Sequence, residues 1–198
     1  MAGPTKQFDQ TLALGQALSV FWKQGFEATS MQDLVQHMGI NRASMYQTYG
    51  NKHALFLAAI DRYIEASLMD LEQMLQAEGP QLTNLQSMFE RIIEQSLQGQ
   101  MAGCLINNSA VELGPHDEEV RDKVRQFWAQ LEQIFQQHLQ MAIDRKELKP
   151  STNPQAVSSL LNSTFQGLVV KTKVAVSQQQ LNEDITEFFS LIQLKYQA

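Results

Sequence analysis

Apolar residues recur at helical spacing between residues 29 and 38. Four of them occupy positions i, i+3, i+4 and i+7 and so share one helix face: Met31, Leu34, Val35 and Met38. Ser30 precedes them as a candidate N-cap, and Asp33 stands three residues later in a near match to the capping box. Gly39 follows the last apolar residue, where a left-handed C-cap favours glycine. The pattern predicts a short helix that ends in a tight turn.

A second short helix is predicted directly after this turn. Asn41 can cap it, with Ile40 and Met45 at the two positions of a hydrophobic staple. The other side chains of this helix are short or hydrogen-bonding and are expected mostly outside the core: Arg42, Ala43, Ser44, Tyr46, Gln47 and Thr48. Two short helices joined by a glycine turn form a helix-turn-helix, and such side chains suit entry into a DNA groove. The segment therefore predicts DNA binding.

The rest of the chain also has helical spacing, without a convincing alternation of the kind that marks a strand. A first helix is expected over about residues 6–24, with five apolar residues inward: Leu12, Ala13, Ala17, Val20 and Phe21. Asn51 can cap a long helix that reaches about residue 77. Further helices are expected over about 82–98, 105–113, 117–146, 154–174 and 177–196. We predict an all-α fold of about nine helices, with a three-helix head at residues 1–51 and a larger body at 52–198.

The cysteine content and the lack of long apolar runs indicate an intracellular protein. Cys104 is the single cysteine of the 198 residues, which excludes an intramolecular disulfide framework. No apolar run approaches the roughly 20 residues that span a bilayer, and no signal-peptide core is present. We expect a cytoplasmic protein without a membrane partner.

The distribution of charge permits DNA binding despite a net charge of −6. The first 60 residues have a net charge of +1, which leaves −7 for the rest; the charged residues of this part are Lys6, Lys23, Arg42, Lys52, Asp9, Glu27 and Asp33. A head of +1 attracts DNA weakly, so two heads on one DNA are expected.

Enzymatic chemistry is disfavoured by the sequence. No histidine follows a glutamate at the spacing of a di-iron bundle, and phosphate-loop, dinucleotide and serine-nucleophile motifs are absent. One cysteine cannot build a sulfur-rich metal site. We therefore expect no catalytic residues, no metal ligands and no cofactor. A helical small-molecule-binding protein without operator recognition remains open as an alternative.

The run GFEATSMQDLVQHMGINRASMYQTYGNKHALF resembles the DNA-binding signature of the tetracycline-repressor (TetR/AcrR) family. The elements that carry the resemblance are Gly25-Phe26, the capped helix from Ser30 to Met38, Gly39, Ala43-Ser44-Met45-Tyr46 and Asn51-Lys52. It is specific over about the first 60 residues. The resemblance implies a bacterial transcriptional regulator, most often a repressor. Such a protein would bind a near-palindromic operator on double-stranded DNA as a homodimer and release it when a small apolar or amphipathic effector binds.

Eight residues of the head are candidates for DNA contact. Arg42 and Gln47 are expected to read base edges, and Ser44 and Thr48 to reach phosphates or bases. Lys52 opens the next helix, where its ammonium and the free backbone amides would hold a phosphate. The resemblance assigns Tyr46 to a phosphate and suggests a base contact for Gln32. Ala43 completes the exposed face: the candidates are Gln32, Arg42, Ala43, Ser44, Tyr46, Gln47, Thr48 and Lys52.

The last two helices carry more apolar surface than a chain end needs, which favours a four-helix interface between two copies. The expected interface residues are Leu161, Phe165, Leu168, Ile185, Phe188, Phe189 and Ile192. The alternative is that both stripes close the chain's own core.

Methionine and aromatic residues of the middle helices are candidates for an apolar effector pocket. They are Met69, Met88, Phe89, Met101, Cys104, Trp128 and Phe165. For each of these residues the alternative is simple core packing. Cys104 follows Gly103 at an expected helix start, where the helix dipole would lower a thiol pKa, so a redox or electrophile sensor stays open beside a buried apolar role.

Overall fold

The computed structural model describes residues 8–99, 103–174 and 176–198. These residues form nine α-helices and one short 3-10 helix. They are α1 (Gln10–Gln24), α2 (Met31–Met38), α3 (Arg42–Tyr49), α4 (Lys52–Leu75), α5 (Gln81–Leu97), α6 (Leu105–Glu112), α7 (Glu118–Asp144), α8 (Pro154–Lys171), η1 (Thr172–Val174) and α9 (Gln178–Tyr196). The expected all-α fold of about nine helices is confirmed.

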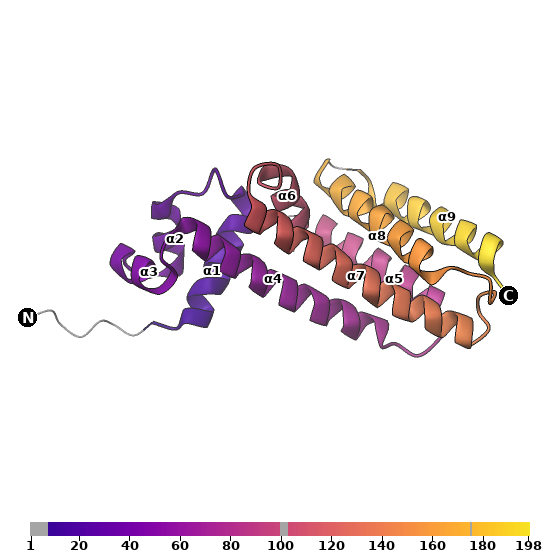
Figure 1. Ribbon diagram of the computed structural model, residues 1–198. Helices are drawn as coiled ribbons and strands as arrows, with labels where there is room; N and C mark the ends of the chain where they lie inside the picture. The colour runs from indigo at the N-terminus through magenta and orange to yellow at the C-terminus, as the bar shows by residue number, and fades with distance from the viewer. Residues whose placement is uncertain (1–7, 100–102, 175) are drawn as a thin grey trace, which may run out of the picture.

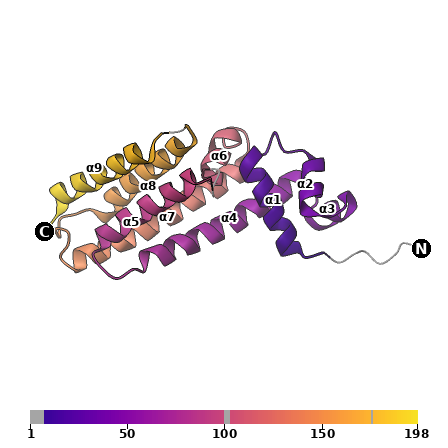
Figure 2. The same cartoon turned by 180° about the vertical axis from the view of Figure 1, so that it is seen from behind.

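The molecule is elongated, with the small head at one end and the helical body at the other (Figure 1). Helices α1–α3 gather around the start of α4, which then continues into the body. There α7 packs mainly on α8, and α5 packs on α9 (Figure 2). The short helix α6 lies between head and body, where it packs on α7 and α4. One continuous helix, α4, therefore connects the two parts.

Side-chain caps fix the helix starts in the head. Ser30 and Asp33 form a complete capping box at α2, and Gly39 ends α2 in the left-handed conformation with φ 65°. The Asn41 side chain accepts from the Ser44 amide at 2.8 Å and so caps α3. These local bonds satisfy the free amides of each first turn, so the predicted helix-turn-helix forms.

The first helix is shorter than predicted. Asp9 Oδ1 accepts from the Leu12 amide at 3.0 Å, so α1 begins at Gln10 rather than near residue 6. Leu12 is 60% exposed, which corrects its predicted inward position. The other four residues of the predicted stripe are buried: Ala13, Ala17, Val20 and Phe21.

Two aromatic groups mark the two parts of the core. In the head, Phe21 stacks edge-on against Phe56 of α4 at 4.9 Å. In the body, Phe89 lies 4.9 Å from Phe165 and 5.3 Å from Phe189, which joins α5, α8 and α9. The start of α4 completes the head core, so the packing of the head continues past residue 51. The domain boundary after residue 51 stays a prediction.

Candidate DNA-binding surface and ligand cavity

The exposed side of α3 presents Arg42, Ala43, Tyr46 and Gln47. Arg42 Nη2 donates to the Tyr46 hydroxyl at 3.4 Å, and the guanidinium carbon lies 5.7 Å from the centre of the Tyr46 ring. Positions i and i+4 of a helix are neighbours on its surface, which is why these two side chains meet. The result is a cation and a hydroxyl held together beside the amide of Gln47.

The other residues predicted to contact DNA differ in how far they are exposed. Gln32 is exposed on α2, and Thr48 is half-buried at the end of α3. Ser44 is buried next to Met45, on the side of α3 that faces the head core. This burial disfavours the predicted contact of Ser44 with DNA, because the helix turns this short side chain inward.

Lys52 is half-buried at the first position of α4. Its ammonium lies 4.3 Å from the centre of the Phe26 ring, in a cation–π contact. Asn51 caps the same helix through the Ala54 amide at 2.8 Å. Lys52 thus carries its charge against an aromatic ring at the start of α4, the helix end where backbone amides are free to bind an anion.

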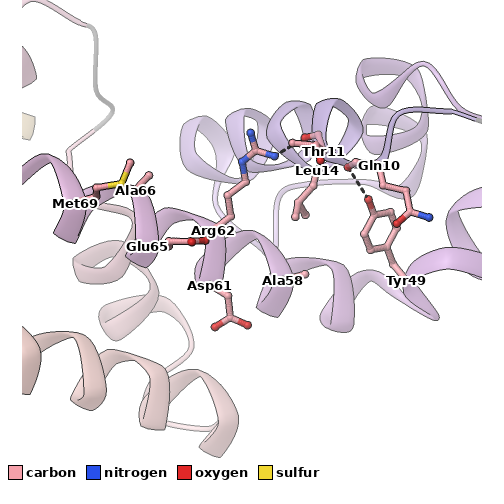
Figure 3. Close-up of a pocket in the computed structure, with 10 residues that line it drawn as sticks. All are labelled: Gln10, Thr11, Leu14, Tyr49, Ala58, Asp61, Arg62, Glu65, Ala66 and Met69. Carbon is pink, nitrogen blue, oxygen red and sulfur yellow. Dashed lines mark hydrogen bonds between the residues drawn. The ribbon is translucent and has the colours of Figure 1, made fainter.

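A surface groove of about 650 Å³ is lined by residues of α1 and α4 (Figure 3). The Tyr49 hydroxyl donates to the Gln10 carbonyl at 3.2 Å, and the Arg62 guanidinium donates to the Thr11 carbonyl. Burial raises the pKa of Tyr49, so this hydroxyl stays a donor. Met69 lies at the far end of this groove and is 66% exposed. Its predicted place in an inner pocket is therefore wrong.

A carboxylate of α6 binds the loop that follows α1. Glu112 Oε2 accepts from the Phe26 amide at 3.1 Å, and its Oε1 accepts from the Glu27 amide at 2.9 Å. Gly25 has φ 83°, and a Cβ there would lie 2.9 Å from Glu112 Oε2. Only glycine fits both that conformation and the close carboxylate. No sequence pattern indicates this role of Glu112, because its partners are backbone groups that lie 85 and 86 residues away.

Trp22 makes a second link between head and body. Its indole Nε1 donates to the Gly103 carbonyl at 2.9 Å, and its ring stacks edge-on against Tyr63 at 5.1 Å. Gly103 and Cys104 directly precede α6. Both ends of this short helix are therefore tied to the head, through Gly103 at its start and Glu112 at its end.

A third link joins the starts of α4 and α7. His53 Nε2 lies 2.7 Å from Asp117 Oδ2 and Nδ1 lies 3.8 Å from Glu119, while Asp117 Oδ1 caps α7 through the Val120 amide at 3.0 Å. Burial opposes ionisation of Asp117, but the hydrogen bonds from Val120, His53 and Glu119 outweigh it and lower the pKa of this carboxyl.

This lowered pKa makes an acid-dependent contribution to stability. It is fully present above the ordinary carboxyl pKa of about 3.9 and is lost as the pH falls through the lower folded value. Asp117→Asn keeps the cap but loses the charge, so we expect a loss of about 1 kcal/mol at pH 7. Urea unfolding between pH 7 and pH 3 should show the difference from the native chain shrinking below about pH 4. A difference that stays constant would contradict this role.

A small cavity of about 70 Å³ lies in the body beside the start of α6. Tyr63 and Ser67 of α4, Ile92 of α5, Phe127 of α7 and Val169 of α8 contribute to its wall. The predicted pocket residues Cys104 and Phe165 also lie in this wall. The cavity therefore lies between α4, α5, α7 and α8.

The other predicted pocket residues do not line this cavity. Met88 and Phe89 are fully buried in the core, where Phe89 contacts three other phenylalanine rings. Trp128 is half-buried on α7 and lies outside the wall. These three residues fill space between helices, which agrees with the alternative of simple core packing. Met101 lies outside the described residues.

Cys104 is buried, and its surroundings disfavour the thiolate. Burial raises the pKa of this thiol, although hydrogen bonds from Tyr63 and the Asn107 and Ile106 amides and the charge of Lys173 act the other way. A neutral thiol is the less nucleophilic form. The structure thus favours the apolar role of Cys104 over the sensor role.

Two sequence profiles match the chain. One, described as "Bacterial regulatory proteins, tetR family", matches residues 13–59. The other, described as "Tetracyclin repressor-like, C-terminal domain", matches residues 80–188 and so covers more than half of the chain. The chain belongs to the TetR family.

Relatives within this family match along almost the whole chain. The uncharacterized HTH-type transcriptional regulator YezE of Bacillus subtilis (strain 168) is 34% identical over 192 residues, which is 96% of this chain and 99% of that protein. The HTH-type transcriptional repressor ComR of Escherichia coli (strain K12) is 29% identical over 181 residues, with 90% and 86% of the two chains covered. The TetR family transcriptional regulator CifR, a cysteine mutant complexed with 26-bp operator DNA, has a TM-score of 0.86 at 22% identity. That match covers 95% of this chain and 98% of CifR.

The described part of this TetR-family chain contains no helix long and apolar enough to cross a membrane. Nor do three or more His, Cys, Asp or Glu side chains gather there in a way that could hold a metal ion.

The residues predicted for the dimer interface mostly face the chain's own core. Six are at most 6% exposed: Leu161, Phe165, Leu168, Ile185, Phe189 and Ile192. Phe188 is half-buried against the same core. These six residues pack against α5 and α7 instead of lying on the outer face, which agrees with the alternative that both stripes close the chain's own core. That outer face carries other apolar side chains, namely Leu160 and Val170 on α8 and Leu191 and Leu194 on α9.

Proposed function

We propose that the chain is a ligand-responsive transcriptional repressor. It would act in the cytoplasm as a homodimer on a near-palindromic operator, and a small effector in the body would release the DNA. The observation that carries this proposal is the exposed side of α3, where Arg42, Tyr46 and Gln47 stand on a helix that is fixed by its caps. The repressor ComR and the operator complex of CifR support it.

Each head would place α3 in a major groove. Arg42 suits a guanine edge and Gln47 an adenine edge, because each can form two parallel hydrogen bonds there. Tyr46 lies beside Arg42, so its hydroxyl is placed for the adjacent phosphate. Lys52 would hold a second phosphate together with the amides at the start of α4. Ala43, Thr48 and Gln32 would make further contacts with the DNA.

Dimerisation would use the outer faces of α8 and α9. Leu160 and Val170 are exposed on α8, and Leu191 and Leu194 are exposed one turn apart on α9. Leu191 is 55% exposed and Leu194 is 83% exposed, which leaves large apolar side chains in water in the single chain. Pairing these faces with their copies would cover them and set the spacing of two heads.

Release of DNA would pass through α4 and α6. The cavity wall includes Tyr63 on α4 and Cys104 at the start of α6. A ligand that spreads this wall would move α6 as a unit, and with it Glu112, which binds the loop before α2. The shift favours release only if the ligand prefers the arrangement of heads that does not fit the operator.

The base-reading and phosphate-binding roles predict different losses of affinity. Arg42→Ala should relax preference at one base position of each half-site and cost about 1–3 kcal/mol at the preferred base. Lys52→Ala should weaken binding to all sequences alike and reduce the salt slope by about 1 for each head. Fluorescence anisotropy at several salt concentrations, on operator variants, measures both effects. Equal effects of the two changes on every sequence would contradict the assignment.

A further inference from the structure

A surface cleft of about 590 Å³ lies at the junction of head and body. Its wall is made by the end of α1, by α6, and by the end of α8 together with η1. Figure 2 shows α6 between the end of α1 and the body helices. No described residue of this wall belongs to the wall of the inner cavity. A molecule in this cleft would contact head and body at once.

Two lysines of this wall have no carboxylate partner among the described residues. The Lys23 ammonium, from α1, makes no ion pair there. The Lys173 ammonium, from η1, donates to the amide oxygen of Asn108 at 2.7 Å. An amide oxygen is uncharged, so this hydrogen bond leaves the charge of Lys173 unmatched.

Gly103 places the stem of Lys173 at the contact between head and body. Gly103 has φ 72°, and a Cβ there would lie 2.9 Å from Lys173 Cδ, so a larger residue would push this stem aside. The carbonyl of the same glycine accepts from Trp22 Nε1 at 2.9 Å. Lys23 follows Trp22 directly in α1. The two cations therefore come from opposite sides of one contact.

The other polar side chains of the wall do not neutralise these lysines. Both oxygens of Glu112 already accept from the amides of the loop after α1, at 3.1 and 2.9 Å. Gln24, Asn107 and Asn108 are uncharged amides. Two lysines and one glutamate give the described wall a net charge of +1, in a chain whose net charge is −6. The wall therefore favours an anion.

Asn107 leaves a buried acceptor of this wall without a partner. The residue is 7% exposed, and its Nδ2 donates to the Gln166 carbonyl at 3.4 Å. Its Oδ1 accepts no hydrogen bond from the described residues. Because buried side-chain oxygens normally have a donor, a hydroxyl or N–H group of a bound molecule suits this position.

Apolar surface lies beside these polar groups. Val111 of α6 is 80% exposed, and Val174 of η1 is 71% exposed. Both belong to the wall, as does the half-buried Trp22. Covering this surface would remove apolar area from water, which favours binding. The cleft thus combines unmatched positive charge, a buried acceptor and exposed apolar side chains.

We propose that this cleft binds an amphipathic organic acid that also carries a hydroxyl or N–H group. Lys23 and Lys173 bind its acid group, and Asn107 Oδ1 accepts from its hydroxyl or N–H group. Its apolar part covers Val111 and Val174. The site is separate from the inner cavity, and the inference does not depend on operator recognition.

Fluorescence titration of the DNA-free protein tests the ligand class, because Trp22 lies in the wall. The chain has two tryptophans, so Trp128→Phe leaves Trp22 as the sole reporter. The probes are octanoate, 2-hydroxyoctanoate, 3-hydroxyoctanoate and 1,2-octanediol. At least one hydroxy acid should bind about threefold more tightly than octanoate and about fivefold more tightly than the uncharged diol. A diol that binds as tightly as the acids, hydroxy acids no better than octanoate, or no binding of any acid would overturn the proposal.

Two variants place the acid in this cleft. Lys23→Gln/Lys173→Gln removes both charges and should weaken binding of the preferred hydroxy acid about fivefold. Val111→Asp adds a carboxylate to the wall and should weaken it at least as much. Lys146→Gln/Lys149→Gln removes two exposed charges beyond the end of α7 and is the matched control, which should bind as the native chain does. Equal affinities for the two double variants would overturn the placement even if Val111→Asp did not fold.

The outcome is separate from that of the proposed function and from binding in the inner cavity. Neither Lys23 nor Lys173 lines the inner cavity, so a loss of affinity in their variant assigns the acid to the cleft. Operator recognition is measured on the ligand-free protein. A chain that selects an operator but shows no lysine-dependent binding of an acid refutes this site alone. A chain that binds the acid but selects no DNA refutes the repressor alone.

Discussion

Leu191→Glu/Leu194→Glu is expected to make the chain monomeric and to lower its affinity for a two-half-site operator at least about 100-fold. Both side chains are exposed on α9, so the change leaves the chain's own core intact. In the proposed dimer, however, each glutamate would lose water without gaining a partner. Two linked heads bind with an effective concentration that a single head of low charge lacks. Sedimentation and operator anisotropy measure the two effects.

The matched control for this change is Met141→Glu. Met141 is an exposed apolar residue on α7, which lies outside the proposed contact face. It should leave both the dimer and the operator affinity unchanged. If the α9 variant stayed dimeric, or if it became monomeric and still bound the operator with native affinity, the proposed interface would be wrong.

Glu112→Ala is expected to free the loop before α2 from the body. The change removes both acceptors of the Phe26 and Glu27 amides, and hydrogen bonds to a charged group contribute roughly 1.5–3 kcal/mol each when shielded from water. Because the loop is partly solvated, we expect an increase of about tenfold in the exchange rate of these two amides. Hydrogen exchange followed by NMR measures it directly. Operator affinity should respond less to any effector, since one of the links between cavity and head is gone.

Two further variants separate the carboxylate from general loosening of the fold. Glu112→Gln keeps one acceptor oxygen and should give an intermediate exchange rate. Glu118→Gln, in the first turn of α7, should leave the loop amides unchanged. Native exchange rates for Phe26 and Glu27 in the Glu112→Ala protein would show that this carboxylate does not hold the head.

Local features of the fold are readable in the sequence because their partners lie close along the chain. The box of Ser30 with Asp33 and the cap at Asn41 involve residues three positions apart. The same holds for the caps of α7 and α9, made by Asp117 and Ser177. Such short-range bonds explain why the helix-turn-helix and most helix starts are predictable from the sequence, whereas α1 begins later than predicted and α8 ends earlier, at the turn η1.

Features that depend on packing between helices are harder to predict from the sequence. Apolar stripes on α8 and α9 were recognised, yet spacing alone does not say which stripe faces the core and which faces a second chain. Ser44 shows the same limit, since a small polar residue fits either side of a short helix. Glu112 carried no signal at all, because its partners are backbone amides of a distant loop. Phe89 shows the same limit, because buried aromatic rings and pocket-lining rings share one sequence pattern.

Selection from random duplex DNA at near-physiological salt tests the central claim most directly. The native protein and the Arg42→Ala/Tyr46→Ala variant are compared, after confirming that both are folded dimers. The native protein alone is expected to enrich an inverted repeat whose half-sites are about one helical turn apart, or a multiple of it. No enrichment by a folded, ligand-free dimer would contradict it and favour a ligand-binding protein without an operator of its own.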